Sequence, residues 1–231
     1  MRRVALLTCT LLLSVLTACM TPAQHLMLSL IPDGTLATLL SHFERPPSGN
    51  RQRVAELEHK GDWPGLAQFA EENLVKDPSN AAWWMVAGYA YSQQKQHARA
   101  IKSFQEMVRL EPDLPDGWNL LAQEYRTIGE PRRAVALLNN AMFAVRESAT
   151  MMLLLGESHA DLDQHELAIK AYRQAVQMNN RLTPAWVALA RSQVRLGRLN
   201  EARDIAKSLE KSQPETAAAI EREIIAAKPQ R

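Results

Sequence analysis

Small and aromatic residues recur along this chain at a spacing of 34 residues, and this period restricts the possible folds more than any other feature. Trp84 and Trp118 are one period apart, and Trp186 follows two periods later. Two further registers contain only small residues: Ala100, Ala134, Ala168 and Ala202 in one, and Gly88, Ala122, Gly156 and Ala190 in the other. A fixed period of this length indicates a stack of similar units, each burying its apolar face against its neighbours.

The period divides residues 47–216 into five units without an insertion, with bounds 47–80, 81–114, 115–148, 149–182 and 183–216. The second unit closely resembles the tetratricopeptide repeat. The residues that match its signature are Trp84, Gly88, Tyr91, Ala100, Phe104 and Pro112. Other units repeat parts of it at Trp118, Ala134, Gly156, Ala168, Trp186 and Ala202. The resemblance implies an all-α fold, a right-handed solenoid of five helix-turn-helix repeats, with a capping helix and tail at 217–231.

Each unit has the length of two helices of about fourteen residues, or roughly 21 Å each. Gly61, Gly129 and Gly197 recur at a spacing of 68, where the two helices of a unit join. Glycine there supplies the left-handed backbone conformation that ends a helix. The first and fourth units depart from the signature, with Asn50 and Met152 at the tryptophan position.

Residues 1–18 are typical of a secretory signal peptide, because a basic start precedes a mostly apolar stretch that is short for a membrane span. The stretch ends in Leu-Thr-Ala-Cys at 16–19, which resembles the lipobox of bacterial lipoproteins. The resemblance implies cleavage before Cys19 and acylation of its thiol with chains such as palmitate, which attach the protein to a membrane. In lipoproteins of this kind, an aspartate directly after the cysteine favours retention in the inner membrane. This chain has Met20 there, so the expected location is the inner leaflet of the outer membrane, facing the periplasm. The alternative is an ordinary signal peptide with an incidental cysteine.

A tether at residues 19–46 is expected between the lipid and the repeats. A short amphipathic helix is predicted within residues 33–43. Its apolar face is formed by residues at i, i+3, i+4 and i+7, which are Leu36, Leu39, Leu40 and Phe43. This face can cover the open end of the solenoid, or it can lie on lipid or dock a partner.

Composition excludes several classes of function. The chain is 46% apolar and 23% charged, which is typical of a globular protein. Without residues 1–18, the 27 basic residues fall to 25 and equal the 25 acidic residues. Such a neutral body argues against nucleic-acid binding. Cys9 and Cys19 both precede the repeats, so they exclude a disulfide or cysteine-based zinc site in the body.

The chain has no phosphate-binding loop or nucleophile motif, so it is predicted not to be an enzyme, and no cofactor or small-molecule substrate is expected.

The resemblance also implies a concave binding wall, formed by fixed positions on the first helix of each unit. These positions hold Met85, Tyr89, Asn119, Gln123, Arg126, Leu153, Glu157, Val187, Arg191 and Arg195. Such a mixture suits an apolar helix or an extended peptide, because methionine adapts to a partner's shape and arginine or amides hold polar groups. The alternative is that about half of these side chains pack within the solenoid.

Two more specialised sites are not expected. Some relatives clamp a C-terminal carboxylate with lysine and asparagine, and that pattern is interrupted by Met85, Tyr89, Leu120 and Leu154. One turn is rich in potential metal ligands: His159, Asp161, Asp163, His165 and Glu166. Their spacing matches no metal motif, so ordinary packing and solvation are expected there.

These features together predict a membrane-anchored periplasmic scaffold that binds a protein or peptide partner in its concave groove. The expected context is assembly of a cell-envelope complex, such as a pilus or secretin, outer-membrane protein assembly, or control of a peptidoglycan enzyme. This context depends on analogy with other lipoproteins of this repeat class. The alternatives are a structural homo-oligomer or an enzyme of the cell wall or of polysaccharides.

Overall fold

A computed structural model describes residues 36–40 and 50–227 of the chain. All regular secondary structure in these residues is helical. The helices are α3 Leu36–Leu40, α4 Arg51–Lys60, α5 Trp63–Lys76, α6 Ala81–Gln93, α7 His97–Leu110, α8 Pro115–Thr127, α9 Pro131–Ala144, α10 Ala149–Ala160, α11 His165–Met178, α12 Thr183–Arg195, α13 Leu199–Leu209 and α14 Pro214–Ala226. Within the described ranges, no helix combines the length and apolarity needed to cross a bilayer.

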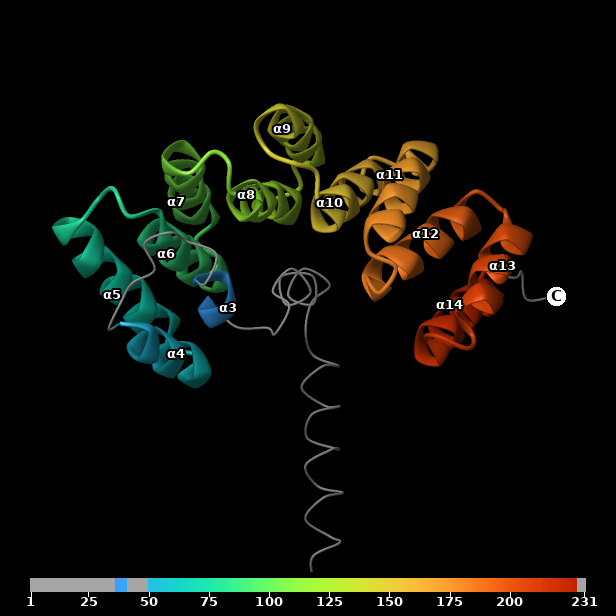
Figure 1. Cartoon of the computed structure of the whole chain (residues 1–231), viewed down its shortest axis with the longest axis horizontal. Coiled ribbons are helices and arrows are strands. Elements are labelled where there is room, and N and C mark those ends of the chain that lie inside the picture. Colours follow the sequence, from blue (N-terminus) through green and yellow to red (C-terminus); the bar gives the residue numbers. More distant parts are fainter. Residues whose placement is uncertain (1–35, 41–49, 228–231) are drawn as a thin grey trace, which may run out of the picture.

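The helices stack in sequence order into an arch (Figure 1). Helices α4, α6, α8, α10, α12 and α14 line its concave side, which we call the inner wall, and α5, α7, α9, α11 and α13 form the outer wall. The pairs from α4–α5 to α12–α13 fall inside the five predicted repeat units. The all-helical solenoid that the resemblance to the tetratricopeptide repeat implies is therefore confirmed.

The turn inside each pair contains one residue in the left-handed region, and these residues recur every 34 positions. Gly61, Gly129 and Gly197 have φ of 65°, 77° and 74°, as expected for glycines that end a helix. Lys95 and Asp163 hold the same position in the second and fourth units, with φ of 59° and 57°. The turn geometry is thus repeated even where a side chain makes it unfavourable.

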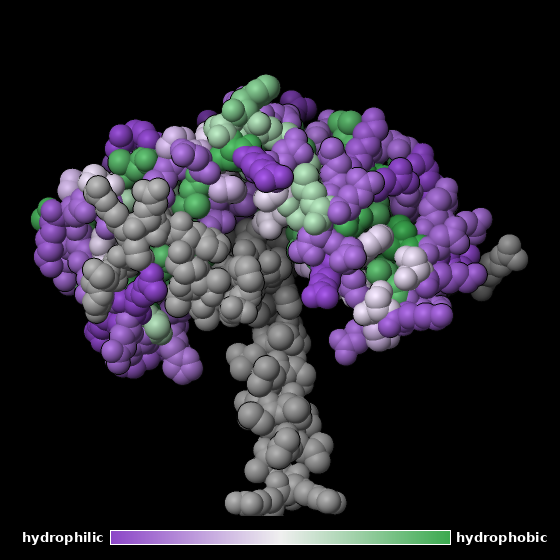
Figure 2. Space-filling model, viewed as in Figure 1, coloured by the Kyte–Doolittle hydropathy of each residue, from purple (hydrophilic) through white to green (hydrophobic). Residues whose placement is uncertain are grey.

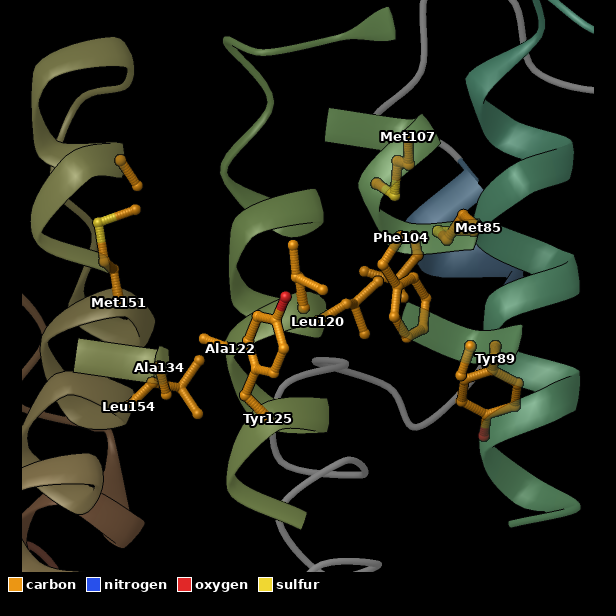
Figure 3. Packing of buried hydrophobic residues seen from close by; sticks show 14 of the residues in the cluster. Met85, Tyr89, Phe104, Met107, Leu120, Ala122, Tyr125, Ala134, Met151 and Leu154 are labelled. Carbon is orange, nitrogen blue, oxygen red and sulfur yellow. The ribbon is translucent and has the colours of Figure 1, made fainter. Parts of the chain in front are cut away.

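Residues of matched size lie where the two helices of a unit approach each other. A Cβ atom added to Gly88 would lie 2.5 Å from the Phe104 ring, and one added to Gly156 would overlap Tyr172. The other units carry different combinations at the same two positions: Val54 with Ala70, Ala122 with Leu138, and Ala190 with Ala206. All of these residues are buried. Figure 3 shows Phe104, Leu120 and Met151 among the side chains that continue the core between units.

The repeated tryptophans connect neighbouring units through their indole N–H groups. The Nε1 atoms of Trp84, Trp118 and Trp186 each donate to the carbonyl of the residue six positions earlier, at 2.9, 2.7 and 2.8 Å. Pro112 is one of these acceptors: it precedes the helix that contains Trp118, and its carbonyl oxygen accepts the hydrogen bond from the Trp118 indole. The other signature residues are buried: Tyr91, Ala100, Ala134, Ala168 and Ala202.

A single helix, α14, ends the array. It spans Pro214–Ala226, so it begins within the last positions of the fifth repeat unit. Ile220 and Ile224 are buried, whereas Ile225 is 64% exposed, because it lies one position past the buried i, i+4 face.

At the other end, α3 packs on the solenoid. Leu36, Leu39 and Leu40 are buried, and α3 contacts α4. The predicted signal peptide, Cys19 and Phe43 lie outside the described residues.

Candidate functional site

The ten predicted groove residues all lie on the inner-wall helices α6, α8, α10 and α12. The structure corrects half of this list. Five of the side chains are at most 5% exposed: Met85, Tyr89, Asn119, Gln123 and Leu153. They belong to the interior of the solenoid and do not form an open wall.

The composition of α6 and α10 explains the burial of Met85, Tyr89 and Leu153. In α6, every residue from Ala81 to Tyr91 except Trp84 is buried, and in α10 the run 151–156 is buried throughout. A helix that is apolar on all faces becomes buried on all faces. The Tyr89 ring, for example, packs edge-on against Trp63 with a centroid separation of 5.8 Å. This signal was present in the sequence, where the runs 81–91 and 151–156 contain almost no polar residue.

The accessible part of the predicted groove lies toward the C-terminal end. We call Val187, Arg191 and Arg195 of α12, with Glu223 of α14, the C-terminal inner wall. Arg191 is 54% exposed on its side chain, Arg195 is exposed, and Val187 is half-buried. Hydrophilic side chains cover most of the solenoid face in Figure 2, with small hydrophobic patches between them.

Ion pairs join the inner-wall helices. Arg126 of α8 donates through Nη1 to Glu157 Oε2 at 2.5 Å and through Nε to Asp161 Oδ2 at 2.7 Å. Arg191 of α12 donates through Nη2 to Glu223 Oε1 of α14 at 2.6 Å. Arg126 is only 13% exposed, so it stabilises the stacking of α8 on α10 and is not free to bind a partner.

Glu157 is the carboxylate most affected by this arrangement. Burial raises the pKa of Glu157 to about 7, the Arg126 guanidinium opposes that rise, and the neighbouring Asp161 carboxylate adds to it. The single guanidinium of Arg126 pairs with two carboxylates, Glu157 and Asp161, so it does not fully balance their negative charges. Burial also raises the pKa of Tyr172, and the charge of Glu157 contributes to that rise.

The structure contains a second buried carboxylate that the sequence analysis missed. Glu124 of α8 is 1% exposed; it accepts from Ser92 Oγ at 2.7 Å and lies 2.5 Å from His97 Nδ1. It therefore joins the second unit to the third. No motif marks it, because its partners lie 27 and 32 residues away in sequence.

Two buried amide oxygens on the inner-wall helices, Asn119 Oδ1 and Gln193 Oε1, have no hydrogen-bond partner.

At the turn with several potential metal ligands, His165 Nε2 and Asp163 Oδ1 lie 3.9 Å apart, and the other ligands contact different residues. Asp161 binds Arg126, Glu166 binds Arg198, and His159 Nδ1 lies 2.8 Å from Gln164 Oε1. Asp163 is almost fully exposed. In the part of the chain that the structure describes, no three such residues converge on one point.

Comparison with known proteins identifies the repeat. One sequence model of the tetratricopeptide repeat matches residues 66–115 and 119–184, and a second matches 159–221. Protein bimA of Emericella nidulans is 25% identical over 114 residues. That match covers 49% of this chain but only 14% of bimA, so it compares the repeats alone.

Solved structures share the fold at low sequence identity. PilW, described as a widely conserved type IV pilus biogenesis factor, has a TM-score of 0.62 and 20% identity, over 76% of this chain and 87% of PilW. TTC0263 from Thermus thermophilus, a thermophilic TPR protein, has a TM-score of 0.59 and 19% identity, over 76% of this chain and 95% of TTC0263. The period, the stacked helix pairs and the two sequence models lead to one conclusion: this chain belongs to the tetratricopeptide-repeat family.

Proposed function

We propose that this chain is a lipid-anchored adaptor of the bacterial cell envelope, without catalytic activity, that holds a protein or peptide partner on its C-terminal inner wall. The observation that carries the proposal is the exposure of Arg191 and Arg195 at positions where this family presents its binding residues. Arginine and a half-buried valine together provide the polar rim and apolar contact that a protein interface uses.

Support for the envelope context comes from the N-terminal sequence. The basic start, the apolar stretch and the cysteine at position 19 follow one another in the order of a lipoprotein signal. Acyl chains on Cys19 would hold the repeats at a membrane surface, where a partner in the same envelope is within reach. The likeness to PilW makes pilus assembly the first context to test, ahead of outer-membrane protein assembly and peptidoglycan-enzyme control.

A crosslinking pull-down from native membranes tests the docking surface. Arg195→Glu reverses an exposed charge on the C-terminal inner wall, and we expect it to reduce capture of the partner at least fivefold. Arg132→Glu, on the outer-wall helix α9, is a matched exposed control and is expected to capture normally. Equal capture by both variants would remove the docking site from this wall. Recovery of only the chain itself would favour the homo-oligomer.

Membrane fractionation tests the anchor separately. Cys19→Ala removes the thiol that would be acylated, so the chain is expected to remain unprocessed or to leave the membrane. A processed variant that partitions like the wild type would exclude lipidation at this residue.

A further inference from the structure

Helix α3 lies within the arch, on the concave side of the solenoid (Figure 1). Its backbone N–H at Leu36 donates to both carboxylate oxygens of Glu58 on α4, at 2.9 and 3.1 Å. Its three leucines, Leu36, Leu39 and Leu40, are at most 3% exposed. A segment from the tether side of the chain therefore occupies part of the same concave wall on which the partner is proposed to bind.

The surface that receives α3 has a definite chemistry. We call it the α3 seat, and it comprises Val54, Leu57 and Glu58 of α4, the helix that α3 contacts. Val54 and Leu57 are the buried residues of α4, and they belong to the same buried cluster as the leucines of α3. The α3 seat thus combines an apolar floor with one carboxylate at its edge.

Helix α3 is too short to be stable without this surface. It has five residues, whereas isolated helices shorter than about 12–15 residues are marginal in water. Its order depends on three leucines and one backbone contact, and not on a helix pair as in the repeats. Such an element can leave while the stacked units remain folded.

We propose that the α3 seat is a docking surface for an amphipathic helix of the partner, with leucines at i, i+3 and i+4, and that α3 is the intramolecular competitor of that helix. This proposal rests on the adaptor function proposed above and adds a second half to its binding wall. The seat accepts the partner as it accepts α3: the leucines fill the apolar floor, and Glu58 receives a free N–H of the first helical turn. A partner that binds both halves of the inner wall would displace α3 from the seat.

Peptide binding to the full chain in detergent micelles tests the competition. The probe is a fluorescein-labelled synthetic peptide with the sequence of residues 33–43, and binding is measured by fluorescence anisotropy. A chain with Leu36→Ser, Leu39→Ser and Leu40→Ser has an open seat, and we expect it to bind the probe at least tenfold more tightly than the wild type. In the wild type, α3 competes at the high effective concentration that its covalent connection provides.

Two matched substitutions on α4 locate the probe. Glu58→Ala in the open-seat chain is expected to weaken binding at least fivefold, because it removes the acceptor for the helix N–H. Glu56→Ala lies two residues away on the same helix, where Glu56 is exposed and pairs with Arg53 and Lys60, so binding should not change. A folded open-seat chain that does not bind the probe, or binds it no better than the wild type, would overturn the proposal. Equal effects of the two substitutions would do the same.

Hydrogen exchange of the wild-type chain gives an answer even if the open-seat variant fails to fold. The α3 amides are expected to exchange at least tenfold faster than those of α6, since α3 leaves the seat without unfolding the repeats. Equal protection of α3 and α6 would make α3 a fixed part of the core and refute the proposal. Both readouts use purified chain, so they are independent of partner capture. Peptide binding without any partner captured from membranes would refute the adaptor function alone, and the converse result would refute only the docking role of the seat.

Discussion

At the residue scale, two positions control how closely the helices of a unit approach. Glycine opposite an aromatic ring, alanine opposite leucine, and valine opposite alanine occur in different units of the same solenoid. The family signature therefore does not require a particular residue at either position. It requires only that the two side chains together fit the space between the helices, and the fifth unit, with Ala190 and Ala206, holds a smaller pair there.

Gly88→Ala tests this requirement. The added methyl would overlap the Phe104 ring, so we expect a loss of about 1–3 kcal/mol in the free energy of unfolding. Adding Phe104→Leu creates the combination that the third unit already uses, and should recover more than half of the loss. Urea denaturation of both single variants and the double variant gives the coupling energy. Simple additivity of the two single effects would contradict the pairing.

Lys95→Gly addresses the turn residues. Lys95 has φ of 59° where three other units have glycine, so glycine should relieve an unfavourable conformation and stabilise the chain by about 0.5–1 kcal/mol. Asp163→Gly should gain less, because aspartate tolerates this region better than lysine. Thermal unfolding of both variants, with Gly129→Lys as the destabilising counterpart, checks the order. A lower melting temperature for Lys95→Gly would show that the lysine side chain makes a compensating contribution.

At the element scale, the sequence predicted the helices better than their exposed faces. The period located every pair, because the turn between the two helices recurs with it in all five units. Half of the inner-wall list is buried, since it was transferred by position from the family. Helices α6 and α10 are apolar on all sides, and α8 also buries Asn119 and Gln123. The location of α3 was not predictable, because leucines at i, i+3 and i+4 fit lipid, a partner or the solenoid equally well. The contacts of Glu124 were not predictable from the sequence either, since they join side chains from three different helices and follow no sequence motif.

The ion pairs between α8 and α10 predict a pH dependence of stability. The pKa of Glu157 is about 7 in the folded chain and near its ordinary value of 4.5 when unfolded. Between these values the folded state binds more protons, so the free energy of unfolding falls as pH rises. The contribution is full below pH 4.5 and is lost as pH rises through 7.

Glu157→Gln removes the titrating carboxyl group, so it should remove the contribution of Glu157 to the pH dependence of the free energy of unfolding. We expect the stability of the wild type relative to the variant to fall by about 1–3 kcal/mol from pH 4.5 to pH 8. Urea denaturation at several pH values measures this difference, with Glu201→Gln at an exposed position as the control. A difference between wild type and Glu157→Gln that stays constant across the range would show that Glu157 keeps an ordinary pKa.

At the scale of the whole molecule, the solenoid has two buried clusters of unequal size. The larger cluster runs from α3 to α12, and the smaller joins α12, α13 and α14 through Ala190, Leu209, Ile220 and their neighbours. Trp186 and Ile205, both partly buried, contact each cluster. Because stacked repeats are stabilised mainly by their nearest neighbours, the C-terminal cluster should open before the rest. The C-terminal inner wall, where we place the partner, adjoins this less stable end.

Ile220→Ala makes that order measurable. Ile220 is fully buried in the smaller cluster, and its truncation is expected to destabilise α13 and α14 by about 2–5 kcal/mol. Hydrogen exchange should then show faster exchange throughout α13 and α14, with little change in α6 to α9. Leu138→Ala, at a fully buried position of the larger cluster, should instead increase exchange across the central units. If both substitutions accelerated exchange equally along the whole chain, the solenoid would unfold as one cooperative unit, and binding at its C-terminal end would stabilise every repeat alike.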